Sequence, residues 1–163
     1  MIDIWKNVIA SLISAVIIAI IFGVWNDNYY KKEDLSGYWE VEFVTVETDY
    51  SPDKDLKTYY YFTVGQNGHS LSGFGEKTSE DSSNGKIQYE TKNRTHLEFQ
   101  GAISYRVFSK SQVNITYREN GRRRPFSTVL SLVVESSNRI SGTYISTAAN
   151  TKGTVTFERV EEI

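Results

Sequence analysis

The sequence predicts an all-β domain, a small up-and-down antiparallel barrel of about eight strands, with one N-terminal transmembrane helix. Three observations support this fold class. A long apolar stretch lies near the N-terminus, and from Asp34 onward apolar and polar residues alternate. The composition includes 11 Tyr, 8 Phe and 3 Trp but only 2 Pro, as is typical of strands. We expect a helix and short linker at residues 1–33 and a ligand-binding β-barrel at 34–163.

Charge and composition exclude several function classes. Lys and Arg number 18 against 20 Asp and Glu, a net charge of -2, which argues against a partner such as polymeric DNA or RNA. The absence of cysteine excludes disulfides and thiol nucleophiles. Only His69 and His96 are available as imidazole ligands. We therefore expect no metal site and no cofactor.

The predicted transmembrane helix covers the charge-free stretch from Asn7 to Asn26, which is 20 residues long. A helix of about 20 residues rises about 30 Å, the thickness of a bilayer's hydrocarbon core. Trp5 and Trp25 flank the stretch, as interfacial anchors do. Lysines lie outside both ends, at Lys6 and at 31–32. These borders favour a helix that spans the membrane.

Two alternatives to a retained span are a cleaved signal peptide and a buried core helix. A signal peptide has a basic start, a shorter apolar segment and a small-residue cleavage site. Here residues 1–6 carry both Asp3 and Lys6, and residues 24–27 read Val-Trp-Asn-Asp. The retained span is therefore favoured. Lys31 and Lys32 after the span favour a cytoplasmic barrel by the positive-inside rule.

Small residues recur at four-residue spacing along the span, on one helical face. They are Ser11, Ala15, Ala19 and Gly23. Small residues permit close packing between membrane helices. The alternative is chance in a segment rich in Ala, Ser and Ile.

Alternation of apolar and polar residues predicts the barrel strands. The expected inward-facing sets are Trp39, Val41 and Phe43; Leu56, Thr58, Tyr60, Phe62 and Val64; Leu97 and Phe99; Val113, Ile115 and Tyr117; Phe126, Thr128, Leu130, Leu132 and Val134; Ile140, Gly142 and Tyr144; and Val155 and Phe157. Short strands at this spacing favour a barrel or a sandwich.

Turn residues separate the expected strands. Asn-Gly occurs at 67–68, 84–85 and 120–121, a dipeptide suited to positive φ, and Ser137-Asn138 is a further expected turn. Residues 49–55 and 76–85 are predicted to be polar loops. An eight-strand count treats residues 86–91 as loop or as part of a neighbouring strand. A nine-strand count would reverse the direction of every later strand.

Gly37-Tyr38-Trp39 at the start of the first strand resembles the Gly-x-Trp of lipocalins and fatty-acid-binding proteins. Trp39 and Arg159 both have the inward parity of their strands. In an eight-stranded barrel the first and last strands are antiparallel neighbours, so we expect a cation–π pair that closes one end. The alternative is a solvated Arg159 near the chain end.

Polar inward positions gather at the end of the barrel opposite Trp39. These candidate ligand-binding residues are Thr45, Thr58, Tyr60, Tyr117, Arg122, Arg123, Arg124 and Tyr144. A barrel of about eight strands holds one small ligand. Tyrosine rings stack on bases, and arginines pair with phosphate oxygens. We therefore predict a nucleotide-type site there.

The arginines and tyrosines of this predicted site also have simpler interpretations. Three arginines at a hairpin tip are commonly a solvated turn, and inward tyrosines are commonly core. Alternation also directs Tyr59 and Tyr61 outward, where they mark either a subunit interface or ordinary cross-strand pairs.

No set of nucleophile, base and orienting residue is visible, and Asp53, Asp55, Glu80 and Asp81 are expected to be loop carboxylates. We therefore expect the protein not to be an enzyme.

One span, a short linker and a minimal barrel together resemble the transmembrane β-barrel effectors of CBASS, the cyclic-oligonucleotide antiphage defence of bacteria. The resemblance covers the whole chain in architecture and rests on residues 7–26, 35–39, 140–144 and 153–159. That family is usually described with two spans, whereas this chain has room for one.

The resemblance implies a receptor in the bacterial inner membrane that binds a cyclic dinucleotide, forms a homo-oligomer and disrupts the lipid bilayer, killing the infected cell. The alternative is a membrane-tethered, lipocalin-like carrier of a lipid or other hydrophobic ligand. A structural subunit of a membrane complex is a third option. Pocket polarity distinguishes the first two.

Overall fold

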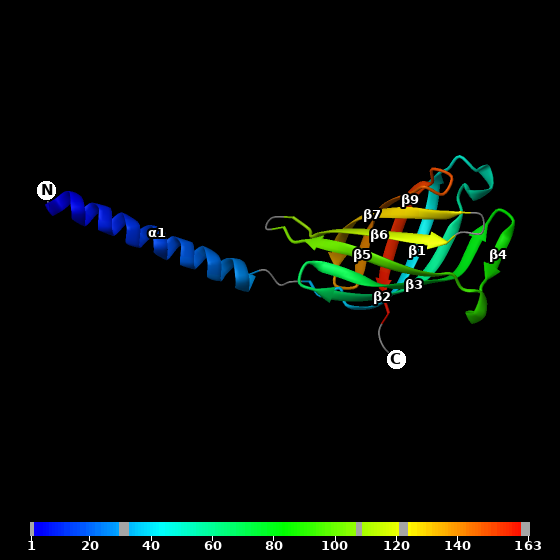
Figure 1. Ribbon diagram of the computed structural model, residues 1–163, viewed down its shortest axis with the longest axis horizontal. Coiled ribbons are helices and arrows are strands. Elements are labelled where there is room, and N and C mark those ends of the chain that lie inside the picture. The colour runs from blue at the N-terminus through cyan, green and yellow to red at the C-terminus, as the bar shows by residue number, and fades with distance from the viewer. Residues whose placement is uncertain (1, 30–32, 107–108, 121–123, 161–163) are drawn as a thin grey trace. The chain divides into compact units, whose positions relative to one another are not determined.

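The computed structural model describes residues 2–29, 33–106, 109–120 and 124–160. The chain divides into two compact units, Met1–Glu33 and Asp34–Ile163. The first unit contains the helix α1 (Ile2–Tyr29), and the second contains all of the strands (Figure 1).

Helix α1 is long and apolar enough between Ile4 and Gly23 to cross a membrane, either as an anchor or as a signal sequence. None of the side chains in that stretch is buried inside the protein. This exposure favours an anchor or a signal sequence over the buried core helix considered above. The small residues at 11, 15, 19 and 23 are all exposed on α1. Their role in helix packing stays a prediction.

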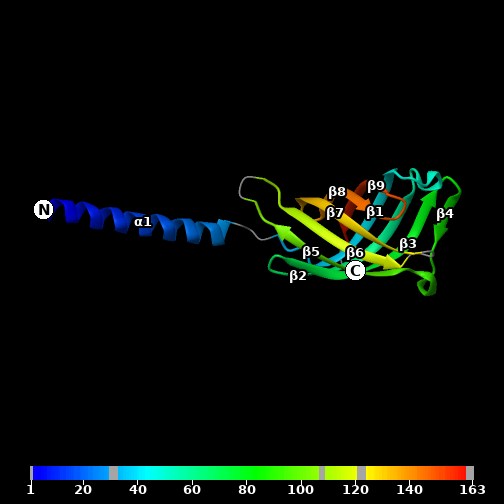
Figure 2. The same cartoon turned by 45° about the horizontal axis from the view of Figure 1, so that its top comes forward.

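Eight antiparallel strands form the closed barrel, as the sequence predicts. They are β1 (Gly37–Glu47), β2 (Lys57–Asn67), β3 (Ser70–Ser82), β5 (His96–Ser104), β6 (Gln112–Asn120), β7 (Pro125–Ser136), β8 (Arg139–Ser146) and β9 (Lys152–Arg159). Each strand pairs with its neighbours in an up-and-down order, and the β1–β9 pairing closes the barrel. Closure leaves these strands without an open sheet edge (Figures 1 and 2).

The polar segment 76–85 is not a loop, which corrects the sequence prediction. Strand β3 continues to Ser82 and pairs with β2 as far as Asp81. After a turn at Ser83 and Asn84, the short strand β4 (Gly85–Gln88) pairs with the last part of β3. This hairpin lies beyond the core, so neither face is apolar and no alternation marks it.

Strand β4 pairs only with β3 among the described strands and takes no part in the closure. It stands at one end of the barrel beside β3 (Figure 1). The ninth strand therefore does not reverse the strands that follow it, and the directions expected from an eight-strand count hold.

The barrel interior is filled by the predicted inward side chains. The most deeply buried large ones are Trp39, Phe62, Phe99 and Phe157. The rings of Phe62 and Phe99 are stacked, with centroids 5.2 Å apart, and Phe62 meets Phe157 edge to face at 5.5 Å. This aromatic packing fills the middle of the barrel. The two ends of the barrel differ in the side chains that line them.

Candidate ligand-binding site

The end of the barrel near Trp39, called here the Trp39 end, is closed by the predicted pair. Trp39 and Arg159 are cross-strand neighbours in β1 and β9, and the guanidinium carbon lies 4.6 Å from the centre of the indole ring. Trp39 Nε1 donates to the carbonyl of Leu35 at 2.9 Å. Arg159 donates to the carbonyls of Ser36, Asp34 and Ser137 at 2.7, 2.7 and 2.9 Å. The arginine therefore holds the segment before β1 over this end.

The opposite end, called here the Tyr144 end, contains a cavity of about 890 Å³. Six of the eight predicted ligand-binding residues line it: Thr45, Thr58, Tyr60, Tyr117, Arg124 and Tyr144. The other two, Arg122 and Arg123, lie outside the described residues. Parity and strand direction thus bring together residues that are up to 99 positions apart, such as Thr45 and Tyr144.

The three inward tyrosines form the inner wall of this cavity and are themselves buried. The hydroxyls of Tyr144 and Thr45 are hydrogen-bonded at 2.9 Å, and the Tyr60 hydroxyl donates to Glu119 Oε2 at 3.2 Å. Burial raises the pKa of Tyr60, Tyr117 and Tyr144, so all three are neutral. Because their rings are packed in the core, their polar ends and not their faces meet the cavity.

Glu119 is a cavity residue that the sequence interpretation missed. It lies on the inward face of β6 and is 6% exposed. Burial raises the pKa of the Glu119 carboxyl, while Lys77 and the Tyr60 hydroxyl oppose that shift. Glu119 continues the alternation of Val113, Ile115 and Tyr117. Glu119 directly precedes the predicted Asn120-Gly121 turn, where alternation is a weak guide to the direction of a side chain.

Three further charged residues come from segments expected to be loops. Lys77 and Glu80, both on β3, form an ion pair at 2.7 Å, and Asp53 lies on the same cavity. Burial is the largest influence on the pKa of Asp53 and raises it. The negative charge of Glu80 raises this pKa further, whereas the positive charge of Lys77 lowers it. Glu80 is therefore a paired carboxylate of the cavity. Glu80 and Asp81 both lie on strand β3, so the expectation of loop carboxylates is wrong for these two.

The outer part of the cavity carries an exposed ring, a half-buried ring and a guanidinium. Tyr50 and Phe126 line it from the β1–β2 connection and the start of β7. Tyr50 is 54% exposed, so its ring face is open to a ligand. Arg124 is also exposed, and within the described residues it donates a long hydrogen bond of 3.5 Å to the Thr147 carbonyl. Stacking surfaces thus lie at the rim.

The side chains at this end supply hydrogen-bonding, aromatic and charged groups. Within the described part of the chain, no group of three or more His, Cys, Asp or Glu is placed to hold a metal ion. The cavity instead combines hydroxyls, aromatic rings, two cations and three carboxylates. Such a mixture of apolar wall and directed polar groups suits a small polar ligand.

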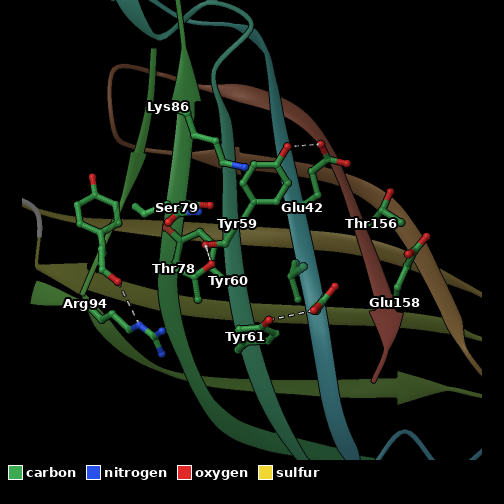
Figure 3. A pocket seen from close by; sticks show the side chains of 14 residues that line it. Glu42, Tyr59, Tyr60, Tyr61, Thr78, Ser79, Lys86, Arg94, Thr156 and Glu158 are labelled. Atoms are coloured by element: carbon green, nitrogen blue, oxygen red, sulfur yellow. Dashed lines mark hydrogen bonds between the residues drawn. The ribbon is translucent and has the colours of Figure 1, made fainter. Parts of the chain in front are cut away.

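A second hollow, of about 520 Å³, lies on the outer face of β1, β2, β3 and β4 (Figure 3). There Tyr59 donates to Glu42 at 3.1 Å and Tyr61 donates to Glu40 at 3.0 Å. Each tyrosine lies directly opposite its glutamate in the β1–β2 register. Tyr59 and Tyr61 therefore point outward as predicted and form cross-strand pairs. A subunit interface here stays a prediction.

Comparison with known proteins identifies the fold and no family. No protein-family model and no curated protein matches the sequence. Among solved structures, a redesigned β-barrel is similar over 78% of this chain and 92% of its own, at 15% identity and a TM-score of 0.50. A redesigned β-barrel bound to DFHBI covers 77% of this chain and 94% of its own, at 13% identity and a TM-score of 0.48. The chain is thus similar in fold to designed β-barrels.

Proposed function

We propose that this chain is a membrane-anchored receptor whose barrel binds a cyclic dinucleotide at the Tyr144 end. The observation that carries the proposal is the lining of the cavity, which has a volume of about 890 Å³. Aromatic rings, hydroxyls and the cations Lys77 and Arg124 line it together. This volume lies in the range of small-molecule sites. Rings bind base faces, and a guanidinium binds phosphate oxygens through paired hydrogen bonds.

The charges of the site support one orientation of such a ligand. Arg124 is exposed at the rim, whereas the carboxylate of Glu119 is buried deeper. A phosphate beside Glu119 would face like charge, so the phosphates belong near Arg124. The bases then point toward the tyrosine hydroxyls.

Downstream, we propose that binding drives self-association and disrupts the bacterial inner membrane, killing the cell as an effector of CBASS-type antiphage defence. A ligand promotes assembly when it binds the assembled form more tightly. The apolar stretch of α1 and its small residues at 11, 15, 19 and 23 support contact between spans.

A lipid carrier is disfavoured by the same cavity. An acyl chain filling it would remove water from Asp53, Lys77, Glu80, Glu119 and Arg124. Burying charges against hydrocarbon without new partners is costly.

The test is calorimetric titration of the full chain in detergent micelles with a panel of cyclic dinucleotides and with a fatty acid. We expect binding of a dinucleotide that weakens as salt is raised, because exposed charges are screened. Arg124→Ala should weaken that binding about 10-fold, the loss of about 1.4 kcal/mol. The matched control is Arg118→Ala, since Arg118 is exposed on the outward face of the same hairpin. Binding of the fatty acid alone would favour the carrier.

A further inference from the structure

Glu119 presents hydrogen-bond acceptors to the cavity that the protein itself does not use. Within the described residues, the Tyr60 hydroxyl is the only hydrogen-bond donor to this carboxylate, and it bonds Oε2. An ionised carboxylate offers about four acceptor sites and no donor. Most of the acceptor capacity of Glu119 therefore remains for a ligand.

Several polar neighbours of Glu119 direct their hydrogen bonds to other groups. Lys77 is close enough to lower the pKa of Glu119, but its ammonium is paired with Glu80 at 2.7 Å. The hydroxyl of Tyr144 is hydrogen-bonded to Thr45, and that of Thr128 donates to Ser146 at 3.0 Å. Glu119 is thus a buried group of this cavity whose hydrogen bonding a ligand would complete.

We propose that Glu119 recognises two adjacent N–H donors on the ligand, which among the nucleobases form the Watson–Crick edge of guanine. This inference rests on the proposed function and specifies its base. Guanine presents N1–H beside its 2-amino group. Adenine and cytosine place one amino group beside a ring-nitrogen acceptor, and uracil flanks its single N–H with two carbonyls.

Selectivity follows from the burial of Glu119. A base that turns an acceptor lone pair toward a buried carboxylate leaves both groups unpaired, and unpaired buried polar groups are costly. Sites built around such hydrogen bonds reject analogues that lack the donor more strongly than apolar pockets do. The rim position of Arg124 agrees with this, because the phosphates stay outside while the base reaches inward.

The experiment measures affinities of the full chain in detergent micelles for three cyclic dinucleotides with guanine, hypoxanthine or adenine bases. Hypoxanthine keeps N1–H and lacks the 2-amino group. We expect guanine to bind at least 100-fold more tightly than adenine, with hypoxanthine between them. Glu119→Gln, which places an amide donor here, should weaken the guanine ligand at least 10-fold. The matched control is Glu40→Gln, because Glu40 accepts a tyrosine hydroxyl on the outer wall.

The possible failures are distinguishable. Equal affinity for guanine and adenine ligands, or a Glu119→Gln variant that binds the guanine ligand normally, would overturn the role of Glu119 and leave the receptor proposal standing. If none of the panel binds, both proposals fall. The comparison of bases uses the unmodified protein, so a folding defect in the variant cannot conceal the answer.

Discussion

At the scale of single residues, the buried carboxyl of Glu119 links the cavity to the stability of the barrel. Burial raises its pKa above the value expected in the unfolded chain. The folded state therefore holds this proton more tightly than the unfolded state does. The stability contributed by protonated Glu119 is fully present below the unfolded pKa and is lost as pH rises through the folded pKa.

Glu119→Gln should remove this pH dependence while keeping an acceptor for the Tyr60 hydroxyl. We expect the variant to gain stability relative to the unmodified protein as pH rises from 4 toward 8. The gain amounts to about 1.4 kcal/mol for each unit by which folding raises the pKa. Thermal unfolding across this pH range measures it. A constant difference between the two proteins at all pH values would contradict the linkage.

Residue by residue, the site was partly predictable. Parity located Thr45, Tyr60, Tyr117 and Tyr144, because a strand's side chains alternate regardless of what lies across the barrel. The exposed ring of Tyr50 had no such signal, since it lies between strands. Local pattern therefore specifies the inner wall of a barrel better than its rim.

At the scale of elements, β3 has an unusual inward face. After Leu71 it presents Gly73 and Gly75, and the rings of Phe62 and Phe99 from the two adjoining strands pack against them. A Cβ on Gly73 would lie 1.9 Å from the Thr63 carbonyl oxygen and 2.7 Å from Phe99 Cζ. The absence of side chains here allows the stacked phenylalanines at the centre of the core.

Gly73→Ala should destabilise the barrel by about 1–3 kcal/mol, the usual penalty for overpacking, because its closest obstruction is backbone. A lower urea midpoint, followed by near-ultraviolet circular dichroism, would show it. Gly65→Ala serves as the control: Gly65 lies on the adjacent strand, and the nearest atom to its added Cβ is 3.6 Å away. Equal midpoints for the two variants would count against the close-approach explanation.

The β3–β4 hairpin shows why the sequence pattern does not predict some elements. Apart from the exposed Ile87, the residues of its outer part are polar on both faces, since beyond the core there is nothing apolar to cover. Its strand conformation comes from pairing with β2, which extends as far as Lys57 opposite Asp81. Such pairing is a long-range interaction, and it placed Lys77 and Glu80 in the cavity.

At the scale of the whole molecule, α1 and the barrel face different surroundings. The apolar side chains of the stretch Ile4–Gly23 are exposed, whereas the barrel buries most of its own. Exposed hydrocarbon over 20 residues matches the requirement for a membrane-spanning helix. The two alternatives left by the structure, an anchor and a signal sequence, differ in whether α1 stays attached.

We expect the intact chain to remain in the membrane fraction after carbonate extraction. The double variant Ile13→Arg, Ile17→Arg should move into the soluble fraction, because each arginine costs roughly 2.5–3.5 kcal/mol near the helix centre. Ile145→Arg is the matched control, since Ile145 is 58% exposed on the barrel and not on α1. A soluble, N-terminally shortened form of the unmodified chain would identify a signal sequence instead.

The sequence by itself determined the apolar helix, the alternating strands and the inward parity of Trp39 and Arg159. These depend on hydrophobicity, local alternation and turn chemistry, all of which are written in consecutive residues. The pairing of β1 with β9, which joins the two ends of the domain, decided for a closed barrel and set Trp39 beside Arg159. Only the tertiary structure decided which charges share the cavity. Asp53, Lys77 and Glu119 come from separate parts of the chain, and their burial and mutual electrostatics exist only once the barrel has closed around them.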